Sequence, residues 1–438
     1  MFIILFVYLF ILIAVGYFSI IKNSLINVYS IIAFSLCIVY ILPYLNPNCP
    51  YRSDQYFALL ISVGLIGFLI SFFLISLLRK KQSHGKLCLS GYYPRKKCRS
   101  KVLSILAATG VILIWFSIFL AFPSLKIDDI IAFILRDRIR EYQEVALDYG
   151  HFFNFLESFL KIPLYLEMFR LWKYRRRLGW FYFATLILEV IVFSHTRFVI
   201  LILLALPFIY QHFYVRPISS KKIMILMVFF IVLTGFFNII RGGGIRNLDN
   251  PPQPIDLKIA LLYGQLMRAG AGSTETFYKV YEGIQEGKID IEFGKQYLIL
   301  PYTPIPRIFW PEKPIVSYFW RLTEALEGRI PGPGQRVLTS TILGEAYHQF
   351  GLTGVFLTPS IYMLILYFYI FYLSMYENTE IIIWMTMIHL PMNIRGGLAS
   401  AVTSFMQTVT VFFLLSFIIY SSSRRCDKHN PLKSLYPF

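Results

Sequence analysis

The sequence predicts an all-α protein that crosses a membrane many times, and three observations support this fold class. Hydrophobic residues make up 57% of the 438 residues, compared with about 45–50% apolar residues in soluble domains. The mean hydropathy is +0.61. Only 15% of the residues are charged, and these gather between long apolar runs. A chain of this length then forms one membrane domain with loops, and we do not expect several soluble domains.

Apolar runs long enough to span a bilayer predict about eleven transmembrane helices. The run at the amino terminus lacks a basic segment and a small-residue cleavage site, so we interpret it as a retained span and not as a signal peptide. The segments 152–172 and 380–394 fit least well, because the first contains charges and the second is short. The predicted spans are 2–21, 25–45, 57–78, 102–122, 152–172, 179–195, 198–214, 223–240, 351–374, 380–394 and 399–421.

The basic loop 79–101 sets the predicted orientation, because lysine and arginine collect on the cytoplasmic side of membrane proteins. This loop contains basic residues and no acid. Counting spans from it places the amino terminus outside and the tail 422–438 in the cytoplasm. The basic residues behind the formal net charge of +18 then mostly set the topology and contact anionic lipid. The charge does not indicate nucleic-acid binding.

The predicted organisation has four parts. Residues 1–240 form the amino-terminal membrane helices, with an amphipathic outer loop at 123–150, and residues 341–421 form the carboxy-terminal membrane helices. Between them lies a large outer loop, 241–340, with a predicted helix at about 255–286 followed by a proline-rich segment. Prolines lower the entropy cost of ordering a loop. We therefore expect a structured cap. Its candidates for stacking on sugars are Tyr302, Trp310 and Trp320, and packing of the loop explains these aromatic residues at least as well.

Arginines at the outer ends of the predicted spans are the strongest functional signal, because topogenic charge belongs on the other side. A guanidinium offers a permanent charge and a planar fork of donors that suits phosphate. The glycines that follow two of these arginines leave backbone amides free for an anion, although helix termination explains the glycines equally well. The candidate anion-binding residues are Arg197, Arg241, Arg336 and Arg395, with Arg268 on the loop helix in reserve.

A helix predicted from about residue 338 would place Thr341, Glu345 and His348 on one face, at a spacing of four and then three residues. A carboxylate beside a histidine is a common arrangement for acid–base catalysis. The alternative is an interfacial helix whose polar face is simply wet. A further acid, Glu189, lies inside a predicted span, where a carboxyl group needs a basic partner or a polar cavity.

The sequence does not predict a metal ion or an organic cofactor. The five cysteines form no metal-binding framework, and the chain has no P-loop, no dinucleotide-binding glycine motif, no nucleophile elbow and no HExxH motif. A reaction on the outer side has no supply of ATP. We therefore expect a substrate that arrives already activated.

With these residues in place, the chain resembles the Wzy-type O-antigen polymerases, which join oligosaccharide repeat units. The basic RX10G spacing described for the family fits Arg321 to Gly332. The resemblance covers the length and the order of the predicted spans. It is sharpest at four segments: SHTRFVI (194–200), IPRIFWPEKP (305–314), LTSTILGEAYHQFG (338–351) and IRGGLASAVTSF (394–405).

The resemblance implies a fold similar to the membrane glycosyltransferases of the C type, in the bacterial inner membrane, without a metal or a cofactor. It implies that the growing glycan is moved from undecaprenyl diphosphate onto the next lipid-linked repeat unit at the periplasmic face. The arginines would then bind the diphosphate, and Glu345 or His348 would take the proton from the acceptor hydroxyl. A chain-length regulator and a flippase are the expected protein partners.

Two alternatives stay open at this point. An O-antigen ligase-like enzyme uses the same lipid-linked donor but transfers the glycan to another acceptor. A lipid-glycan transporter or flippase belongs to a different class, and transporters place their ionisable residues near the middle of the membrane. An acyltransferase with His389 as its base is a third possibility, although no motif around that residue supports it.

Overall fold

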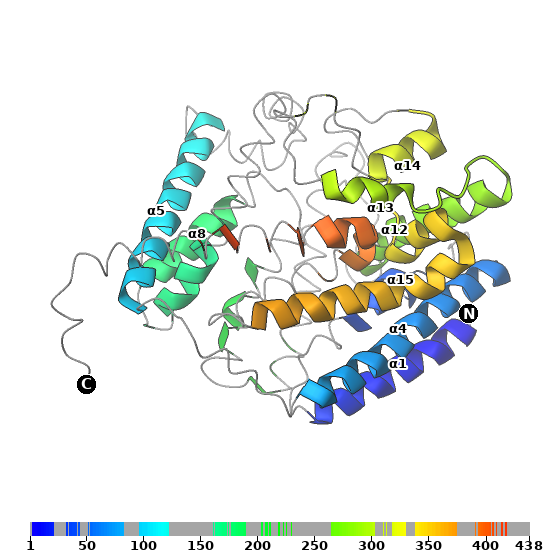
Figure 1. Cartoon of the computed structure of the whole chain (residues 1–438), viewed down its shortest axis with the longest axis horizontal. Helices are drawn as coiled ribbons and strands as arrows, with labels where there is room; N and C mark the ends of the chain where they lie inside the picture. The colour runs from blue at the N-terminus through cyan, green and yellow to red at the C-terminus, as the bar shows by residue number, and fades with distance from the viewer. Residues whose placement is uncertain are drawn as a thin grey trace, which may run out of the picture. The chain divides into compact units, whose positions relative to one another are not determined.

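The part of the chain that the computed structural model describes is helical and contains no strand (Figure 1). It divides into two compact units, residues 1–85 with 219–405 and residues 86–218 with 406–438. The described residues are 2–21, 32–33, 35–41, 43, 51, 53–82, 96–121, 161, 163–172, 174, 177–189, 203–204, 206–208, 210–211, 218–219, 222, 225, 229, 264–302, 310, 312, 318–329, 338–374, 390, 393–403, 405–406, 409, 413–414 and 417.

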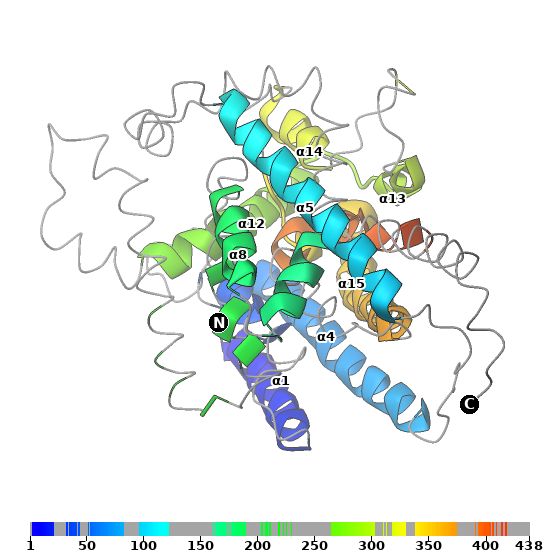
Figure 2. The ribbon, with the colours of Figure 1, turned by 90° about the vertical axis from the view of Figure 1, so that its left-hand side faces the viewer.

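The first unit holds most of the helices and all of the described candidate site. The long helix α15 lies against α4, and α1 lies beside α4 (Figure 1 and Figure 2). A further helical segment covers residues 393–403. The elements of this unit are α1 (Phe2–Ile21), the π-helix η1 (Cys37–Ile41), α4 (Gln55–Gln82), α12 (Gly264–Gln285), α13 (Lys295–Ile299), the 3-10 helix η4 (Leu300–Tyr302), α14 (Tyr318–Glu327) and α15 (Ile342–Ser374).

Two of the described helices are long and apolar enough to cross a membrane. These segments are Gln55–Ile75 in α4 and Ile342–Ile370 in α15. Shorter apolar helices occur at Ile4–Ala14, Leu103–Phe116 and Leu178–Glu189. The predicted fold class is thus confirmed as all-α with apolar helices suited to a membrane. The total of eleven spans and the orientation of the termini stay predictions, and the outer loop 123–150 lies outside the described residues.

Small residues let α4 and α15 approach each other closely. A Cβ added at Gly64 would press into a leucine side chain of α15, and one added at Gly67 would lie 2.6 Å from the carbonyl oxygen of Phe356. One turn further along α4, the hydroxyls of Ser71 and Ser360 lie 2.9 Å apart. Glycine and serine at such spacing are typical of helix pairs packed in membranes. This contact holds α15 against the amino-terminal helices.

The helix α15 is two helices joined by a break at Gly351. Its φ of 63° and ψ of −146° are not helical, and a residue with a side chain rarely adopts such a φ. The break falls where the predicted span 351–374 begins. The segment before it, 342–350, carries Glu345 and His348. This helix was predicted from about residue 338, but it begins four residues later.

The second unit contains α5 (Lys96–Ala121), a helical segment at 163–172 and α8 (Leu178–Glu189). Buried acids in this unit have basic partners. Glu189 has only 1% of its side chain exposed and lies 2.8 Å from the ammonium of Lys161, so of the two alternatives for Glu189, a basic partner or a polar cavity, the structure shows the basic partner. Glu167 accepts hydrogen bonds from Arg170 Nε at 2.7 Å and from the Ser104 hydroxyl at 2.8 Å.

Candidate functional site

The candidate site starts at the amino-terminal end of α15, and a threonine caps that end. The hydroxyl of Thr341 accepts a hydrogen bond from the backbone N–H of Gly344 at 3.1 Å. Its carbonyl accepts one from the N–H of Glu345 at 2.9 Å. Threonine is a common residue at this position, because its oxygen satisfies a backbone donor that the helix leaves unpaired. The cap explains why the helix starts at residue 342, and it removes Thr341 from the predicted polar face.

Glu345 has no exposed surface. Its Oε1 accepts a hydrogen bond from the backbone N–H of Ala399 at 3.0 Å. Gly397, two residues before Ala399, has a φ of +87°, and a Cβ at that position would collide with Glu345 Oε2. The carboxyl group is therefore seated in the turn at 397–399, which only a glycine at position 397 can form. The backbone amides beside the glycines that follow Arg395 were predicted to be free for an anion. In the structure the carboxyl group of Glu345 occupies this position.

Arg395 leads into the same turn and is held by a hydroxyl from α12. Its Nε donates a hydrogen bond of 3.0 Å to the hydroxyl of Ser273. Ser273 is fully buried, and its oxygen lies 3.3 Å from that of Thr339. Arg395 as a whole is exposed, yet protein atoms crowd its guanidinium and lower its pKa through lost hydration. No carboxylate among the described residues forms an ion pair with Arg395.

His348 is also buried, with 4% of its surface exposed. Its Nδ1 lies 3.2 Å from the hydroxyl of Tyr318 on α14, and the tautomer of the ring decides which atom donates. Its backbone carbonyl accepts a hydrogen bond of 2.9 Å from the N–H of Glu292. The segments 290–302 and 318–329, which lie in the predicted outer loop, thus cover the face of α15 that carries His348. The alternative of a wet polar face is wrong, because both Glu345 and His348 are buried.

A polar network ties these loop segments to α15. Glu292 accepts a hydrogen bond of 2.6 Å from the side chain of Gln349 and lies 3.2 Å from the guanidinium of Arg321. Arg321 also donates to the side chain of Gln296, whose backbone N–H donates to Gln349 at 3.2 Å. Such a network ties the cap to α15, because its part-buried members share hydrogen-bond partners. Arg321, the first residue of the RX10G spacing, has a structural position here.

Two tyrosines in the cap respond to the buried carboxyl group. Burial raises the pKa of Tyr297 well above its usual value, and the nearby carboxyl of Glu345 raises it further. The pKa of Tyr318 rises in the same way, mainly through burial and then through Glu345. The hydroxyl of Tyr297 and Oε2 of Glu345 are both buried, and neither has a hydrogen-bond partner of ordinary geometry within the described part of the protein. Both tyrosines stay neutral donors at physiological pH.

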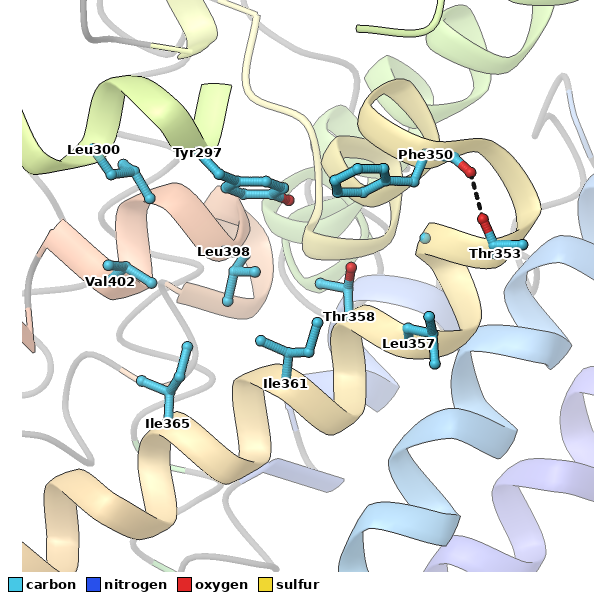
Figure 3. A pocket seen from close by; sticks show the side chains of 11 residues that line it. Tyr297, Leu300, Phe350, Thr353, Leu357, Thr358, Ile361, Ile365, Leu398 and Val402 are labelled. Carbon is cyan, nitrogen blue, oxygen red and sulfur yellow. Dashed lines mark hydrogen bonds between the residues drawn. The ribbon is translucent and has the colours of Figure 1, made fainter. Parts of the chain in front are cut away.

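An apolar cavity of about 460 Å³ lies beside this cluster (Figure 3). It falls within the range of about 300–1,000 Å³ that is usual for small-molecule sites. α13 and η4, the second half of α15 and the helical segment 393–403 each contribute to its walls. The lining residues are Tyr297, Leu300, Phe350, Thr353, Gly354, Leu357, Thr358, Ile361, Ile365, Leu398 and Val402.

The structure describes only part of the predicted site. It brings Glu345, His348 and Arg395 into one unit. Arg197, Arg241 and Arg336 lie outside the described residues, and for Arg268 the structure describes only the backbone, in α12. The described part of the predicted loop helix is α12 (Gly264–Gln285), and residues 255–263 lie outside the described residues. Within the described ranges no group of three or more His, Cys, Asp or Glu residues is placed to hold a metal ion.

The predicted sugar-binding aromatics lie on the cap. Tyr302 is 43% exposed, and its ring meets that of Trp310 edge-on, with the centroids 5.4 Å apart. Trp310 and Trp320 are both half-buried. The contact between the Tyr302 and Trp310 rings is a packing contact, and the exposed surface of Tyr302 leaves it open to a ligand.

The sequence alone did not single out Ser273, Tyr318 or the apolar cavity. Ser273 and Tyr318 are single polar residues in segments whose pattern gives no reason to select them. The apolar cavity joins segments that lie far apart along the chain. A usable signal existed for Gly397, because it follows an arginine and another glycine.

No protein-family model, curated protein or solved structure matches the chain. A function for the protein is therefore argued from its residues and their geometry.

Proposed function

We propose that the protein is a membrane glycosyltransferase that polymerises oligosaccharide repeat units linked to undecaprenyl diphosphate. The growing glycan is transferred as a whole to the next lipid-linked unit, at the periplasmic face of the bacterial inner membrane. The amino terminus lies in the periplasm and the carboxy terminus in the cytoplasm. The reaction requires no metal and no cofactor, and a flippase and a chain-length regulator act with the protein.

One observation carries this proposal: Arg395 and the carboxyl group of Glu345 meet at the same turn. The N–H of Ala399 binds Glu345 at 3.0 Å, and Arg395 enters that turn with its Nε fixed on Ser273 at 3.0 Å. A guanidinium that is oriented by a hydroxyl, and that has no acidic partner among the described residues, suits a phosphate group. A buried carboxyl group within the same turn suits proton transfer in a site from which water is excluded. The segment 395–399 therefore contacts both the hydroxyl of Ser273 and the carboxyl group of Glu345.

In the proposed reaction, an acceptor hydroxyl oxygen attacks the anomeric carbon of the donor sugar. The bond between this carbon and the diphosphate oxygen breaks, and the diphosphate leaves with the electron pair. Arg395 stabilises the charge that develops on the leaving group, and a preorganised donor of this kind contributes about 3–4 kcal/mol in other enzymes. His348 or Glu345 takes the proton of the acceptor hydroxyl. Every atom and charge in this step is accounted for without a further reactant.

The other predicted residues complete the proposal. Arg197, Arg241, Arg336 and Arg268 add positive charge around the diphosphate. The aromatic side chains of the cap stack on sugar rings, and Tyr302 is the most accessible of those described.

The experiment that tests this function is a reaction of the purified protein in lipid vesicles with the lipid-linked repeat unit alone. A polymerase converts this single substrate into a ladder of longer lipid-linked glycans, which gel electrophoresis separates. An O-antigen ligase-like enzyme leaves it unchanged until another acceptor is added. A flippase moves it across the bilayer without changing its length, and either of these results would refute the proposal.

The replacement Arg395→Lys tests the anion-binding role. Lysine keeps the charge but loses the planar fork, so we expect elongation to fall at least a hundredfold while the protein still inserts and folds. Arg329→Lys is the matched control, because Arg329 is paired with Glu327 at 2.6 Å and lies away from the turn. Normal elongation by the Arg395→Lys protein would remove Arg395 from the mechanism.

A comparison of Glu345→Gln with His348→Gln assigns the base. Loss of a general base typically lowers the rate by about 10²–10⁴-fold. Glutamine at position 345 keeps an oxygen for the N–H of Ala399, so this variant removes the acid but retains the turn. The variant with the larger fall in kcat at an unchanged KM identifies the base. If both variants keep the wild-type kcat, neither residue takes the proton.

A further inference from the structure

The apolar cavity has one wall on the membrane-spanning half of α15. Leu357, Ile361 and Ile365 follow one another at four-residue intervals along this wall (Figure 3). Residues spaced in this way lie on one face of a helix, and eight residues cover about 12 Å of its length. Leu357 and Ile361 are 52% and 46% exposed. The wall is therefore an elongated apolar stripe that the protein itself leaves open.

The opposite wall comes from the helix that carries Arg395. Leu398 and Val402 line the cavity, and they follow Arg395 along the segment 393–403, after the positive-φ residue Gly397. The helix that presents the guanidinium at its start thus presents an apolar surface further along. A ligand that contacts both must have an anionic end and a hydrocarbon end.

The cavity also has a distinct end towards the cap. The rings of Tyr297 and Phe350 stack there, with centroids 5.9 Å apart and planes inclined by 18°. The hydroxyl of Tyr297 is buried there and interacts with the buried carboxyl group of Glu345. This is therefore the polar end of the cavity.

We infer that this cavity binds the part of the lipid substrate's hydrocarbon chain nearest to the diphosphate, and so selects donors by their chain. The identity of the head group rests on the proposed function, whereas the apolar site itself rests on the cavity. The chain lies along Leu357, Ile361 and Ile365, and the diphosphate reaches Arg395. A phospholipid of the surrounding bilayer fits this arrangement less well, because its glycerol backbone and second acyl chain would have to enter beside the Tyr297 and Phe350 rings.

Filling the cavity tests the inference. The variant Ile361→Trp places a bulky ring in the stripe, and Leu364→Trp is the control, because Leu364 is similarly exposed at 42% on the same helix and does not line the cavity. For each protein, KM and kcat are measured with the undecaprenyl-linked donor and with a donor whose isoprenoid chain is replaced by a methyl group. The thermal unfolding midpoint of each variant is recorded in parallel.

We expect the wild-type protein and Leu364→Trp to favour the long chain through a lower KM. In Ile361→Trp, we expect the ratio of the KM values for the two donors to fall about tenfold, which corresponds to the burial of roughly two methylene groups. The KM for the short donor should change little. An unchanged preference in Ile361→Trp refutes the inference. An equal rise of KM for both donors also refutes it, because the substitution would then act on the head-group site.

A second measurement does not require catalysis and therefore separates this inference from the proposed function. Polyprenyl diphosphate with a photoreactive group in its first isoprene units is irradiated with the wild-type protein in vesicles, and labelled peptides are identified by mass spectrometry. Label on 354–365 and 398–402 supports the inference even if no polymerisation is found. Label elsewhere, or equal displacement of the label by added phosphatidylglycerol, refutes it.

Discussion

The hydrogen bond between Arg395 and Ser273 provides the sharpest test of how the site is organised. Replacing Ser273 with alanine removes the oxygen that accepts the Nε proton of Arg395 at 3.0 Å. The hydroxyl of Thr339, 3.3 Å from that of Ser273, loses its contact as well. The charge of Arg395 is untouched. The variant therefore tests the orientation of the guanidinium, and Ser273 is a positioning residue in this reasoning.

The structure sets the size of the expected effect. A hydrogen bond to a charged group contributes about 1.5–3 kcal/mol, and each 1.4 kcal/mol corresponds to a factor of ten. If this bond holds Arg395 in the orientation that the transition state requires, Ser273→Ala lowers kcat/KM by roughly 10- to 150-fold. Ser273→Thr keeps the hydroxyl and should recover most of this loss.

The assay measures initial rates of glycan elongation in vesicles, together with the thermal unfolding midpoint. Thr274→Val is the matched control, because the neighbouring Thr274 hydroxyl donates to the carbonyl of Val39 and the substitution removes that hydroxyl without touching Arg395. We expect Thr274→Val to lower the midpoint while kcat/KM stays close to the wild-type value. A wild-type kcat/KM for Ser273→Ala would refute the positioning role. So would equal losses of activity in both variants, since they would reflect destabilisation alone.

The remaining predictions concern stability and are checked by thermal or denaturant unfolding in detergent. Gly397→Ala should lower the free energy of unfolding by more than about 2 kcal/mol, because a positive φ costs a residue with a side chain about 1–2 kcal/mol and its Cβ collides with Glu345. Adding Glu345→Ala to the Gly397→Ala protein should restore only the part of the lost free energy of unfolding that is due to the collision. Full recovery would show that the positive φ adds no backbone strain. Lys161→Met should cost about 3–5 kcal/mol, because it removes the ammonium that lies 2.8 Å from the buried carboxyl group of Glu189. The double variant Lys161→Met, Glu189→Leu should recover most of this loss in free energy of unfolding. If the losses of the two single variants simply add, the two residues do not interact.

The helices of the protein could largely be predicted from its sequence, because apolar composition and helical spacing are local properties. The predicted span 2–21 coincides with α1. The errors lie at the boundaries, where single contacts decide the outcome. The cap formed by Thr341 moves the start of α15 to residue 342, and α5 begins at Lys96, inside the loop predicted for 79–101.

The candidate site could be predicted only in part, because its contacts join distant parts of the chain. The proximity of Glu345 and His348 follows from their three-residue spacing on a helix. The bond between Glu345 and Ala399 spans 54 residues, and that between Arg395 and Ser273 spans 122. No periodic pattern encodes a hydrogen bond between two single residues at such separations. The identity of Arg395 as a candidate came from its charge on the outer side, whereas the residue that orients it required the structure.

The break at Gly351 allows one helix to serve two environments. Before the break, Glu345 and His348 are buried under the cap, where every polar group needs a partner. After it, Leu357 and Ile361 leave large apolar surfaces exposed, as a segment facing lipid or a hydrocarbon chain requires. An unbroken helix would continue the same face from one environment into the other. The non-helical φ and ψ of Gly351 uncouple the two faces, so the polar cluster and the apolar stripe can lie at opposite ends of a single site.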